Sequence, residues 1–260
     1  MPIATVHGID LFYDLTGPEV GPVVAFSNSL GTSLAMWEAQ AAALTGRFRC
    51  LRYDTRGHGR SATLDRPATI EDLAGDLRGL LDHLGIARAH IVGLSLGGMT
   101  AQAFAATSPE RVDRLVLMAT APHLPPATLW TERAATARRD GMGALVDAVI
   151  ARWFTPAFHD APQVGAVRRQ LMATDPAGYA AACGVIAGMD LRPRLGRIGA
   201  PTLIISGADD PSTPPARGEE LRAGIAGAEF VVLPGAAHLL NIEAAARVNR
   251  HLLGFLDAAA

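Results

Sequence analysis

The stretch HIVGLSLGGMT, residues 90–100, decides the fold. Its first half is apolar and predicts a strand, and its second half, continued by AQAFAATS, predicts a helix. Between them Ser95 stands in a Gly-x-Ser-x-Gly pattern, with Gly93 and Gly97 on either side. A serine in this context is typical of a nucleophile elbow, a strained turn where larger residues at the two glycine positions would collide with the neighbouring strand and helix. The alternative is a glycine-rich turn with an incidental serine.

Short apolar runs along the rest of the chain predict the strands of one sheet. A hairpin is expected over residues 4–17, followed by strands over 22–28, 48–54, 89–95, 114–120, 201–207 and 229–235. Nearly continuous apolar runs are expected of strands buried on both faces. Helical patterns lie between them, as over residues 69–85. The sequence therefore predicts an α/β fold with a mostly parallel eight-stranded sheet flanked by helices.

One interval interrupts the alternation of strands and helices. Between Ala121 and Ile198 the sequence shows helical patterns and proline-containing bends, and no strand pattern. We expect a helical cap over residues 122–197, inserted after the sixth strand. Residues 1–121 and 198–260 would then form the core domain.

Composition excludes several classes of function. The 260 residues are 49% hydrophobic and carry a formal net charge of −2. The sequence therefore lacks the excess of positive charge expected of a protein whose partner is nucleic acid or an anionic membrane. All 23 basic residues are arginine, which excludes a lysine phosphate loop, a Schiff-base lysine and a Ser-Lys hydrolase. We expect a cytoplasmic protein, because no signal-peptide pattern or apolar run of about 18 residues occurs. The number of subunits stays open.

Cysteine and metal-ligand patterns are sparse. Cys50 and Cys183 are expected to be buried thiols rather than a disulfide. The sequence has no His-Glu-x-x-His, His-x-His or paired-cysteine motif, and no Gly-x-Gly-x-x-Gly after the first strand. No metal and no cofactor are expected.

A serine nucleophile needs a base and an acid, in the order serine, acid, histidine for this type of fold. His238 follows the last strand on a loop before the final helix, whereas His251 lies within that helix and His123 and His159 lie in the insertion. We assign His238 as the base. The earlier His58 is interpreted as structural.

The acid should follow the strand over residues 201–207, where the sequence offers Asp209 and Asp210. Spacing favours Asp210, with Asp209 as a turn residue. The oxyanion hole needs two N–H donors, which we assign to the amides of Leu96, after the nucleophile, and Leu30. Ser29, next to Leu30, is the alternative donor.

At these residues the chain resembles the 3-oxoadipate enol-lactonases of the α/β-hydrolase superfamily. The segments that carry the resemblance are FSNSLGTSLAMWEAQ, RYDTRGHGRSA, GLSLGGM, ARWFTP, PTLIISGADDPSTPP and GAAHLLNIE. The elbow and histidine loop are shared across the superfamily, while SNSLGT and RWFTP are more specific. The resemblance covers essentially the whole chain, and Ser95, Asp210 and His238 fall where that family has its triad. It implies hydrolysis of an enol-lactone to 3-oxoadipate in bacterial catabolism of protocatechuate and catechol.

That substrate is a small lactone that bears a carboxylate. A cap pocket for it should offer a cation and an apolar wall, and we assign Arg152 and Trp153 to these roles. The alternative is that Trp153 anchors a cap helix while Arg152 is solvated. Arg133, Arg138 and Arg139 are rival cations.

Two other functions remain possible on the same scaffold. A different lactonase or a carboxylesterase, with cofactor-free haloperoxidase side activity, would keep the fold and triad and differ in the cap. A non-catalytic small-molecule receptor would keep the fold without turnover, and an intact elbow, acid and histidine argue against it.

Overall fold

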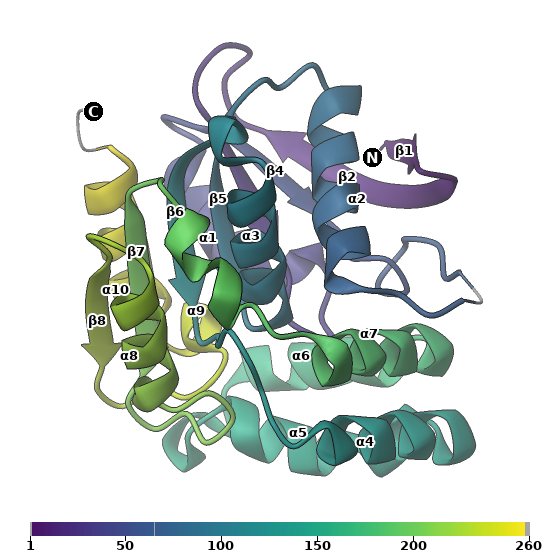
Figure 1. Cartoon of the computed structure of the whole chain (residues 1–260). Helices are drawn as coiled ribbons and strands as arrows, with labels where there is room; N and C mark the ends of the chain where they lie inside the picture. The colour runs from purple at the N-terminus through teal and green to yellow at the C-terminus, as the bar shows by residue number, and fades with distance from the viewer. Residues whose placement is uncertain (1, 65, 258–260) are drawn as a thin grey trace.

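The computed structural model describes residues 2–64 and 66–257 and places them in one three-layer α/β unit (Figure 1). Its eight strands are Ile3–Val6 (β1), Ile9–Thr16 (β2), Val23–Ser27 (β3), Arg49–Tyr53 (β4), Ala89–Leu94 (β5), Val112–Met118 (β6), Thr202–Gly207 (β7) and Glu229–Leu233 (β8). Its α-helices are Glu38–Leu44 (α1), Ile70–His83 (α2), Leu96–Thr107 (α3), Ala127–Asp140 (α4), Val146–Trp153 (α5), Pro162–Ala173 (α6), Pro176–Gly188 (α7), Pro215–Gly224 (α8), Leu240–Glu243 (α9) and Ala245–Leu256 (α10).

The strands form one sheet in the order β1-β2-β4-β3-β5-β6-β7-β8. The hairpin strands β1 and β2 pair antiparallel, and β2 also pairs antiparallel with β4, whereas every other neighbouring pair is parallel. Helices α2, α3 and α8 cover one face, and α1 and α10 cover the other (Figure 1). The predicted fold class and strand count are confirmed.

One expectation about the strands was wrong. β8 is not buried on both faces: Phe230 and Val231 are partly buried, Val232 is 39% exposed, and within this strand only Leu233 is buried. The reason is its position at the edge of the sheet, where only β7 pairs with it. By contrast, every residue of the central strands β3, β5 and β7 is buried, because helices cover both of their faces.

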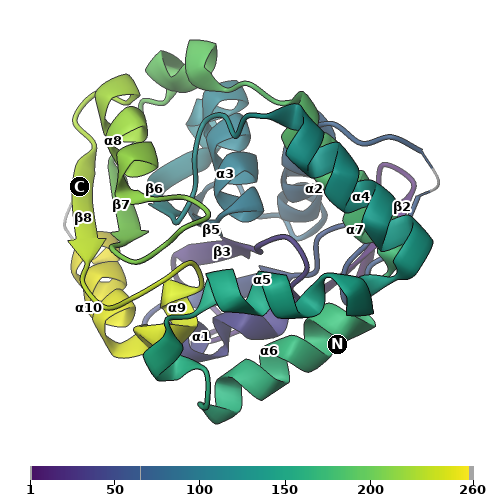
Figure 2. The same cartoon turned by 90° about the horizontal axis from the view of Figure 1, so that it is seen from below.

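Helices α4, α5, α6 and α7 lie together beyond the carboxyl ends of the parallel strands (Figure 1). Seen from below, α4 runs beside α7 and α5 runs beside α6, so the two pairs border the end of the sheet (Figure 2). The described part of the interval 122–197 contains no strand, as the sequence predicts. At its base, the amide of Leu191 donates to the carbonyl of Pro122 over 2.8 Å.

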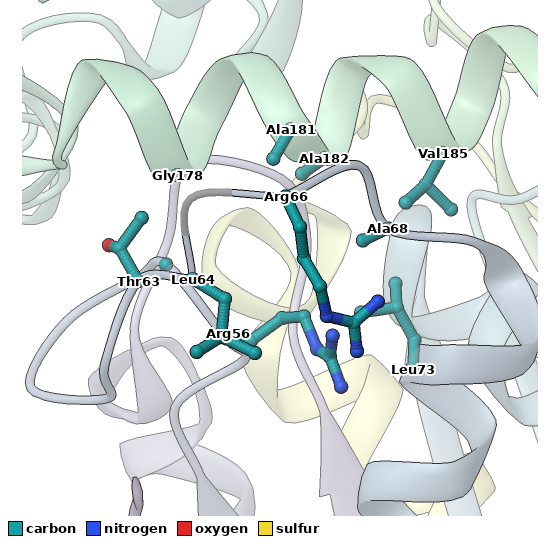
Figure 3. Close-up of a pocket in the computed structure, with 11 residues that line it drawn as sticks. Arg56, Thr63, Leu64, Arg66, Ala68, Leu73, Gly178, Ala181, Ala182 and Val185 are labelled. Atoms are coloured by element: carbon teal, nitrogen blue, oxygen red, sulfur yellow. The ribbon is translucent and has the colours of Figure 1, made fainter. Parts of the chain in front are cut away.

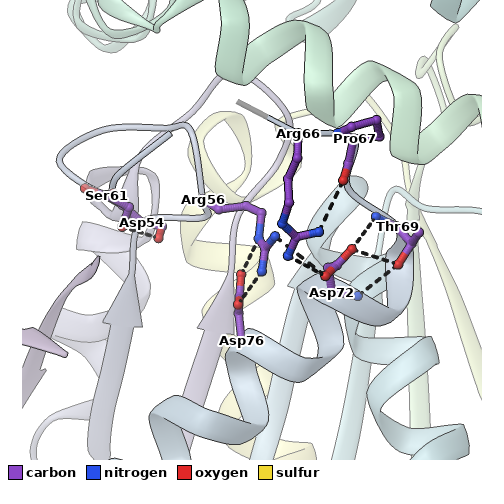
Figure 4. A network of polar contacts seen from close by, with 8 residues as sticks. All are labelled: Asp54, Arg56, Ser61, Arg66, Pro67, Thr69, Asp72 and Asp76. Atoms are coloured by element: carbon purple, nitrogen blue, oxygen red, sulfur yellow. Dashed lines mark hydrogen bonds and ion pairs between the residues drawn. The ribbon is translucent and has the colours of Figure 1, made fainter. Parts of the chain in front are cut away.

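The loop after β4 supports one side of these helices. Arg56, buried in that loop, donates two hydrogen bonds of 2.6 Å to the Asp76 carboxylate on α2 (Figure 4). The loop then passes directly under α7, where Gly57 and Gly178 meet backbone to backbone (Figure 3 shows Gly178 above Arg56). A Cβ on Gly178 would lie 2.1 Å from the Gly57 carbonyl oxygen. Only two glycines allow α7 to approach the core this closely.

The start of α2 is fixed by a capping box at Thr69. The Thr69 hydroxyl accepts from the amide of Asp72, and the Asp72 carboxylate accepts from the amide of Thr69 over 2.8 Å, which completes a capping box (Figure 4). Arg66 also pairs with Asp72, at 3.0 Å. This end of α2, which lies below α7, is therefore held in a fixed position.

Candidate active site

Ser95 stands at the turn between β5 and α3, in a strained backbone conformation. Its φ of 55° and ψ of −117° are rare for a residue with a side chain, which is typical of functional turns. The turn needs the flanking glycines: a Cβ on Gly93 would lie 2.2 Å from the Gly97 carbonyl oxygen, and one on Gly97 would lie 2.0 Å from that of Ser27. The predicted collision with helix and strand is therefore confirmed for both glycines.

The same turn is held by hydrogen bonds to the neighbouring strand. The Ser95 amide donates to the carbonyl of Met118 over 3.0 Å, and the Thr120 hydroxyl donates to the Ser95 carbonyl over 2.8 Å. Both partners lie at the end of β6 or just after it. These bonds offset part of the strain and fix the hydroxyl-bearing residue at the carboxyl edge of the sheet.

Asp210 and His238 meet on loops that follow β7 and β8. The Asp210 Oδ2 atom lies 2.8 Å from His238 Nδ1, and both side chains are almost completely buried. Asp209, the alternative acid, is exposed. Since Nδ1 faces the carboxylate, the Nε2 atom of His238 remains available to accept a proton.

Thr213 joins the acid to the base. Its hydroxyl lies 2.6 Å from Asp210 Oδ2 and 3.2 Å from His238 Nδ1, while the amides of Ser212 and Thr213 donate to Asp210 Oδ1. Burial opposes ionisation of Asp210, but the positive charge of His238 and the hydrogen bonds from His238 and Thr213 outweigh it, so the pKa of Asp210 is lowered. Thr213 was not predicted from the sequence, although its place three residues after Asp210 in the loop was a usable signal.

Ser95 and His238 line the same pocket, which has a volume of about 110 Å³. In the described structure no hydrogen bond joins their side chains. Catalytic hydrogen bonds are often long in free enzymes and shorten when substrate binds. The other histidines lie elsewhere: His123 pairs with the carbonyl of Met189, and His159 with that of Phe154.

The loop after β3 brings its backbone to the pocket beside Ser95. Asn28 fixes this loop, because its side-chain amide donates to the carbonyl of Tyr53 over 2.7 Å and its oxygen accepts from the indole N–H of Trp37 over 2.9 Å. Leu30 and Ser29 both line the pocket. The Ser29 amide donates to the sulfur of Met36, whereas the Leu30 amide makes no hydrogen bond within the part of the chain that the structure describes.

Leu96 is the first residue of α3, so its amide cannot have a partner within the helix. The free N–H groups and dipole at this helix end favour negative charge. The Leu30 amide is thus a donor on a loop that lines the same pocket as Ser95, and the Leu96 amide is a donor on the residue that follows Ser95.

The cap helices supply the rest of the pocket. Arg152 and Trp153 of α5 both line the pocket. Trp153 also belongs to the hydrophobic core, since only 6% of its surface is exposed. Arg133 of α4 lines the pocket too, whereas Arg138 and Arg139 do not. Two cations therefore face the same space as Ser95.

Neither pocket arginine is neutralised by a carboxylate. Among the described residues Arg133 and Arg152 make no ion pair, and the pocket lining contains no aspartate or glutamate. Arg133 instead lies over the ring of Trp130, 5.0 Å from its centre. Such a pocket attracts small anions, since an arginine pairs readily with a carboxylate.

Metal, thiol and membrane chemistry have less support in the structure. Within residues 2–64 and 66–257 no group of three or more His, Cys, Asp or Glu side chains could hold a metal ion. Cys50 and Cys183 are buried and unpaired, and burial raises the pKa of the Cys50 thiol to about 11. No helix in the described ranges combines the length and the apolar character that crossing a membrane requires.

Comparisons with known proteins agree with this geometry. The model of the alpha/beta hydrolase fold family matches residues 22–145 and 163–245. The chain is 39% identical to 3-oxoadipate enol-lactonase 2 of Acinetobacter baylyi over 241 residues. The aligned region covers 92% of this chain and 90% of that protein.

Two solved structures extend the likeness to three dimensions. The enol-lactonase of Burkholderia xenovorans is 44% identical and superposes with a TM-score of 0.97 over 99% of this chain and 100% of that chain. A thermophilic esterase of Thermogutta terrifontis, solved with malate bound, is 30% identical with a TM-score of 0.92 over 98% of this chain and 97% of that one.

Proposed function

Because the chain belongs to the alpha/beta hydrolase fold family and, within it, to the 3-oxoadipate enol-lactonases, we propose that it hydrolyses the enol-lactone of 3-oxoadipate. One observation carries the choice of substrate: Ser95 opens into a small pocket with two arginines that no carboxylate neutralises. The enol-lactone is a small ring with one carboxylate, so it offers both the electrophile and the anion that this pocket fits. The related esterase of Thermogutta terrifontis was solved with malate, a small carboxylate, bound.

The first half of the reaction is acylation of Ser95. His238 Nε2 accepts the hydroxyl proton as Ser95 Oγ attacks the lactone carbonyl, and Asp210 steadies the imidazolium through Nδ1. The amides of Leu30 and Leu96 stabilise the tetrahedral oxyanion, and one such donor is worth about 10²- to 10³-fold in rate in a serine protease. The C–O bond of the ring then breaks, and the enolate oxygen leaves with the proton from His238.

The second half is hydrolysis of the acyl-enzyme. A water molecule gives its proton to His238 and attacks the acyl carbonyl, and collapse of the intermediate returns the proton to Ser95 Oγ. The released enol becomes the ketone of 3-oxoadipate by tautomerisation. An enol leaves more readily than an alkoxide, so little general-acid assistance is needed. Protein groups and water supply every step, so the mechanism uses no cofactor.

The cap has the task of selecting the substrate. We assign residues 122–197 to this unit, with Arg133 and Arg152 as the cations and Trp153 as a flat apolar wall. The buried thiols Cys50 and Cys183 are compatible with a reducing cytoplasm, where a step in aromatic catabolism would take place.

The test compares the enol-lactone with its neutral methyl ester. We expect wild type to favour the anionic lactone in kcat/KM by about tenfold or more, as one charge-assisted contact would supply. Arg133→Gln and Arg152→Gln should reduce this preference. Arg138→Gln is the matched control, because Arg138 lies on the same helix as Arg133 and does not line the pocket.

A carboxylesterase on this scaffold would behave differently. It would cleave p-nitrophenyl acetate quickly, leave the enol-lactone intact and show no preference for the anionic substrate. That result would keep the triad and overturn the substrate.

A further inference from the structure

Tyr179 is a polar residue of the pocket wall to which the reaction above gives no role. It lies on α7, and its side chain is completely buried, with 0% of its surface exposed. Its hydroxyl makes no hydrogen bond of ordinary geometry within the described residues, and Arg133, which acts on it as a side-chain hydrogen-bond partner, can only donate. The hydroxyl proton is therefore buried without an acceptor, which costs free energy and calls for an explanation.

The ring and the hydroxyl of Tyr179 face different surroundings. The ring packs on Gly31, directly after Leu30: a Cβ there would lie 3.0 Å from Tyr179 Cε2. The hydroxyl end is close to the two pocket arginines. Burial raises the pKa of Tyr179, whereas the positive charges of Arg133 and Arg152 and a side-chain hydrogen bond from Arg133 oppose this rise.

We infer that the Tyr179 hydroxyl and the Arg133 guanidinium together form a carboxylate-binding subsite, in which the phenol donates a hydrogen bond to the bound anion. The inference rests on the proposed function for its substrate and deepens it by naming a second donor. A carboxylate has about four lone-pair positions, which one guanidinium does not fill. The phenol supplies a neutral donor that does not repel the cations beside it.

The chemical class that fits is a small carboxylate that also carries the acyl group exposed to Ser95 in the same pocket. Arg133 is only partly buried and lies against Trp130, so its side chain has room to turn toward an anion. When it does, the Tyr179 hydroxyl becomes accessible from the pocket. Specificity then follows, because a neutral ligand would leave both donors buried without an acceptor.

The test removes only the hydroxyl. Tyr179→Phe keeps the ring on Gly31, and we expect it to raise KM for the enol-lactone about tenfold, with a much smaller effect on kcat, as loss of a hydrogen bond to a charged group would do. The preference for the anionic lactone over its methyl ester should fall by a similar factor. Tyr13→Phe is the control, because Tyr13 is a buried tyrosine of β2 that does not line the pocket.

A second readout is independent of the enol-lactone. Adipate, a six-carbon dicarboxylate, should inhibit hydrolysis of p-nitrophenyl acetate by wild type, and Tyr179→Phe should raise its inhibition constant about tenfold. If the enol-lactone is inert but adipate inhibition depends on Tyr179, the substrate proposal fails and the subsite stands. If the enol-lactone is hydrolysed and Tyr179→Phe changes neither KM nor adipate inhibition by more than about twofold, the subsite is wrong.

A spectroscopic measurement covers the case of a variant that does not fold. The chain has three tyrosines, so their Cζ carbons can be followed by NMR in labelled wild-type protein. Adipate should shift the Tyr179 resonance and leave that of Tyr13 in place. Absence of any shift at saturating adipate would contradict the inference.

Discussion

The Asp210 carboxylate lies 2.8 Å from Nδ1 of His238, although the two residues follow different strands of the sheet. The parallel strands β7 and β8 end at the same edge, so their loops meet there. Gly207 makes the meeting possible, because a Cβ on it would lie 2.4 Å from the carbonyl oxygen of Ala236. The acid and the base are thus placed by the sheet rather than by a long flexible loop.

The contact between Asp210 and His238 predicts that removing the Asp210 charge slows catalysis strongly while the protein still folds. Asp210→Asn should lower kcat by about 10⁴-fold, because the amide no longer holds the imidazole in the tautomer that accepts the serine proton. Asp209→Asn should change kcat by less than twofold, since Asp209 is exposed beside the pair. Steady-state kinetics checks both variants. Equal losses in the two would contradict the assignment of Asp210.

The lowered pKa of Asp210 predicts how stability depends on pH. Because the folded protein binds this proton more weakly than the unfolded chain, ionised Asp210 adds stability above the ordinary carboxyl pKa. That contribution is lost as pH falls from about 4 through the lowered pKa of the folded state. The difference in free energy of unfolding between wild type and Asp210→Asn, measured in urea, should therefore shrink below about pH 4. A difference that grows on acidification would contradict this account.

The elbow predicts that Gly97 cannot carry a side chain. Gly97→Ala would drive a methyl group to within 2.0 Å of the Ser27 carbonyl oxygen, so we expect a loss of about 1–3 kcal/mol in the free energy of unfolding and little remaining activity. Gly75→Ala, in α2, meets no atom within 4 Å and should stabilise the protein by about 0.5–1 kcal/mol. Urea unfolding of the two variants measures this difference in stability. Equal changes in the free energy of unfolding would contradict the prediction.

The contact of Gly178 with Gly57 predicts a link between cap position and activity. Gly178→Ala should push α7 away from the core, lower stability by about 1–3 kcal/mol and reduce kcat/KM for the enol-lactone. The matched control is Gly184→Ala on the same helix, where nothing lies within 4 Å. If Gly178→Ala leaves both quantities at the level of the control, the close approach does not position the cap.

Much of this organisation could be predicted from the sequence, because it depends on local patterns. The elbow around Ser95 combines an apolar strand, two glycines and a helix within eleven residues, and the order of acid and base follows from the strand ends. The exposure of β8 could not be predicted, because its apolar sequence does not indicate that the strand lies at the edge of the sheet.

The residues that line the pocket were also difficult to predict from the sequence, because their positions depend on tertiary packing. Tyr179 reaches the pocket only because α7 crosses the loop at Gly57, a contact between distant parts of the chain. Arg133 could not be separated from Arg138 and Arg139 by sequence, because the choice depends on how α4 is rotated. The sequence left the Ser29 and Leu30 amides as alternative oxyanion donors. The structure favours Leu30, because the Ser29 amide already donates to the Met36 sulfur, a contact that sequence patterns do not reveal.

The most direct measurement is hydrolysis of the enol-lactone of 3-oxoadipate by wild type and by Ser95→Ala, with p-nitrophenyl acetate in parallel. We expect wild type to consume the lactone with a much higher kcat/KM than the acetate. Ser95→Ala should lose at least about 10⁴-fold of the lactone activity while it keeps the wild-type melting temperature. Wild type that leaves the lactone intact, or a Ser95→Ala variant that still opens it, would contradict the account.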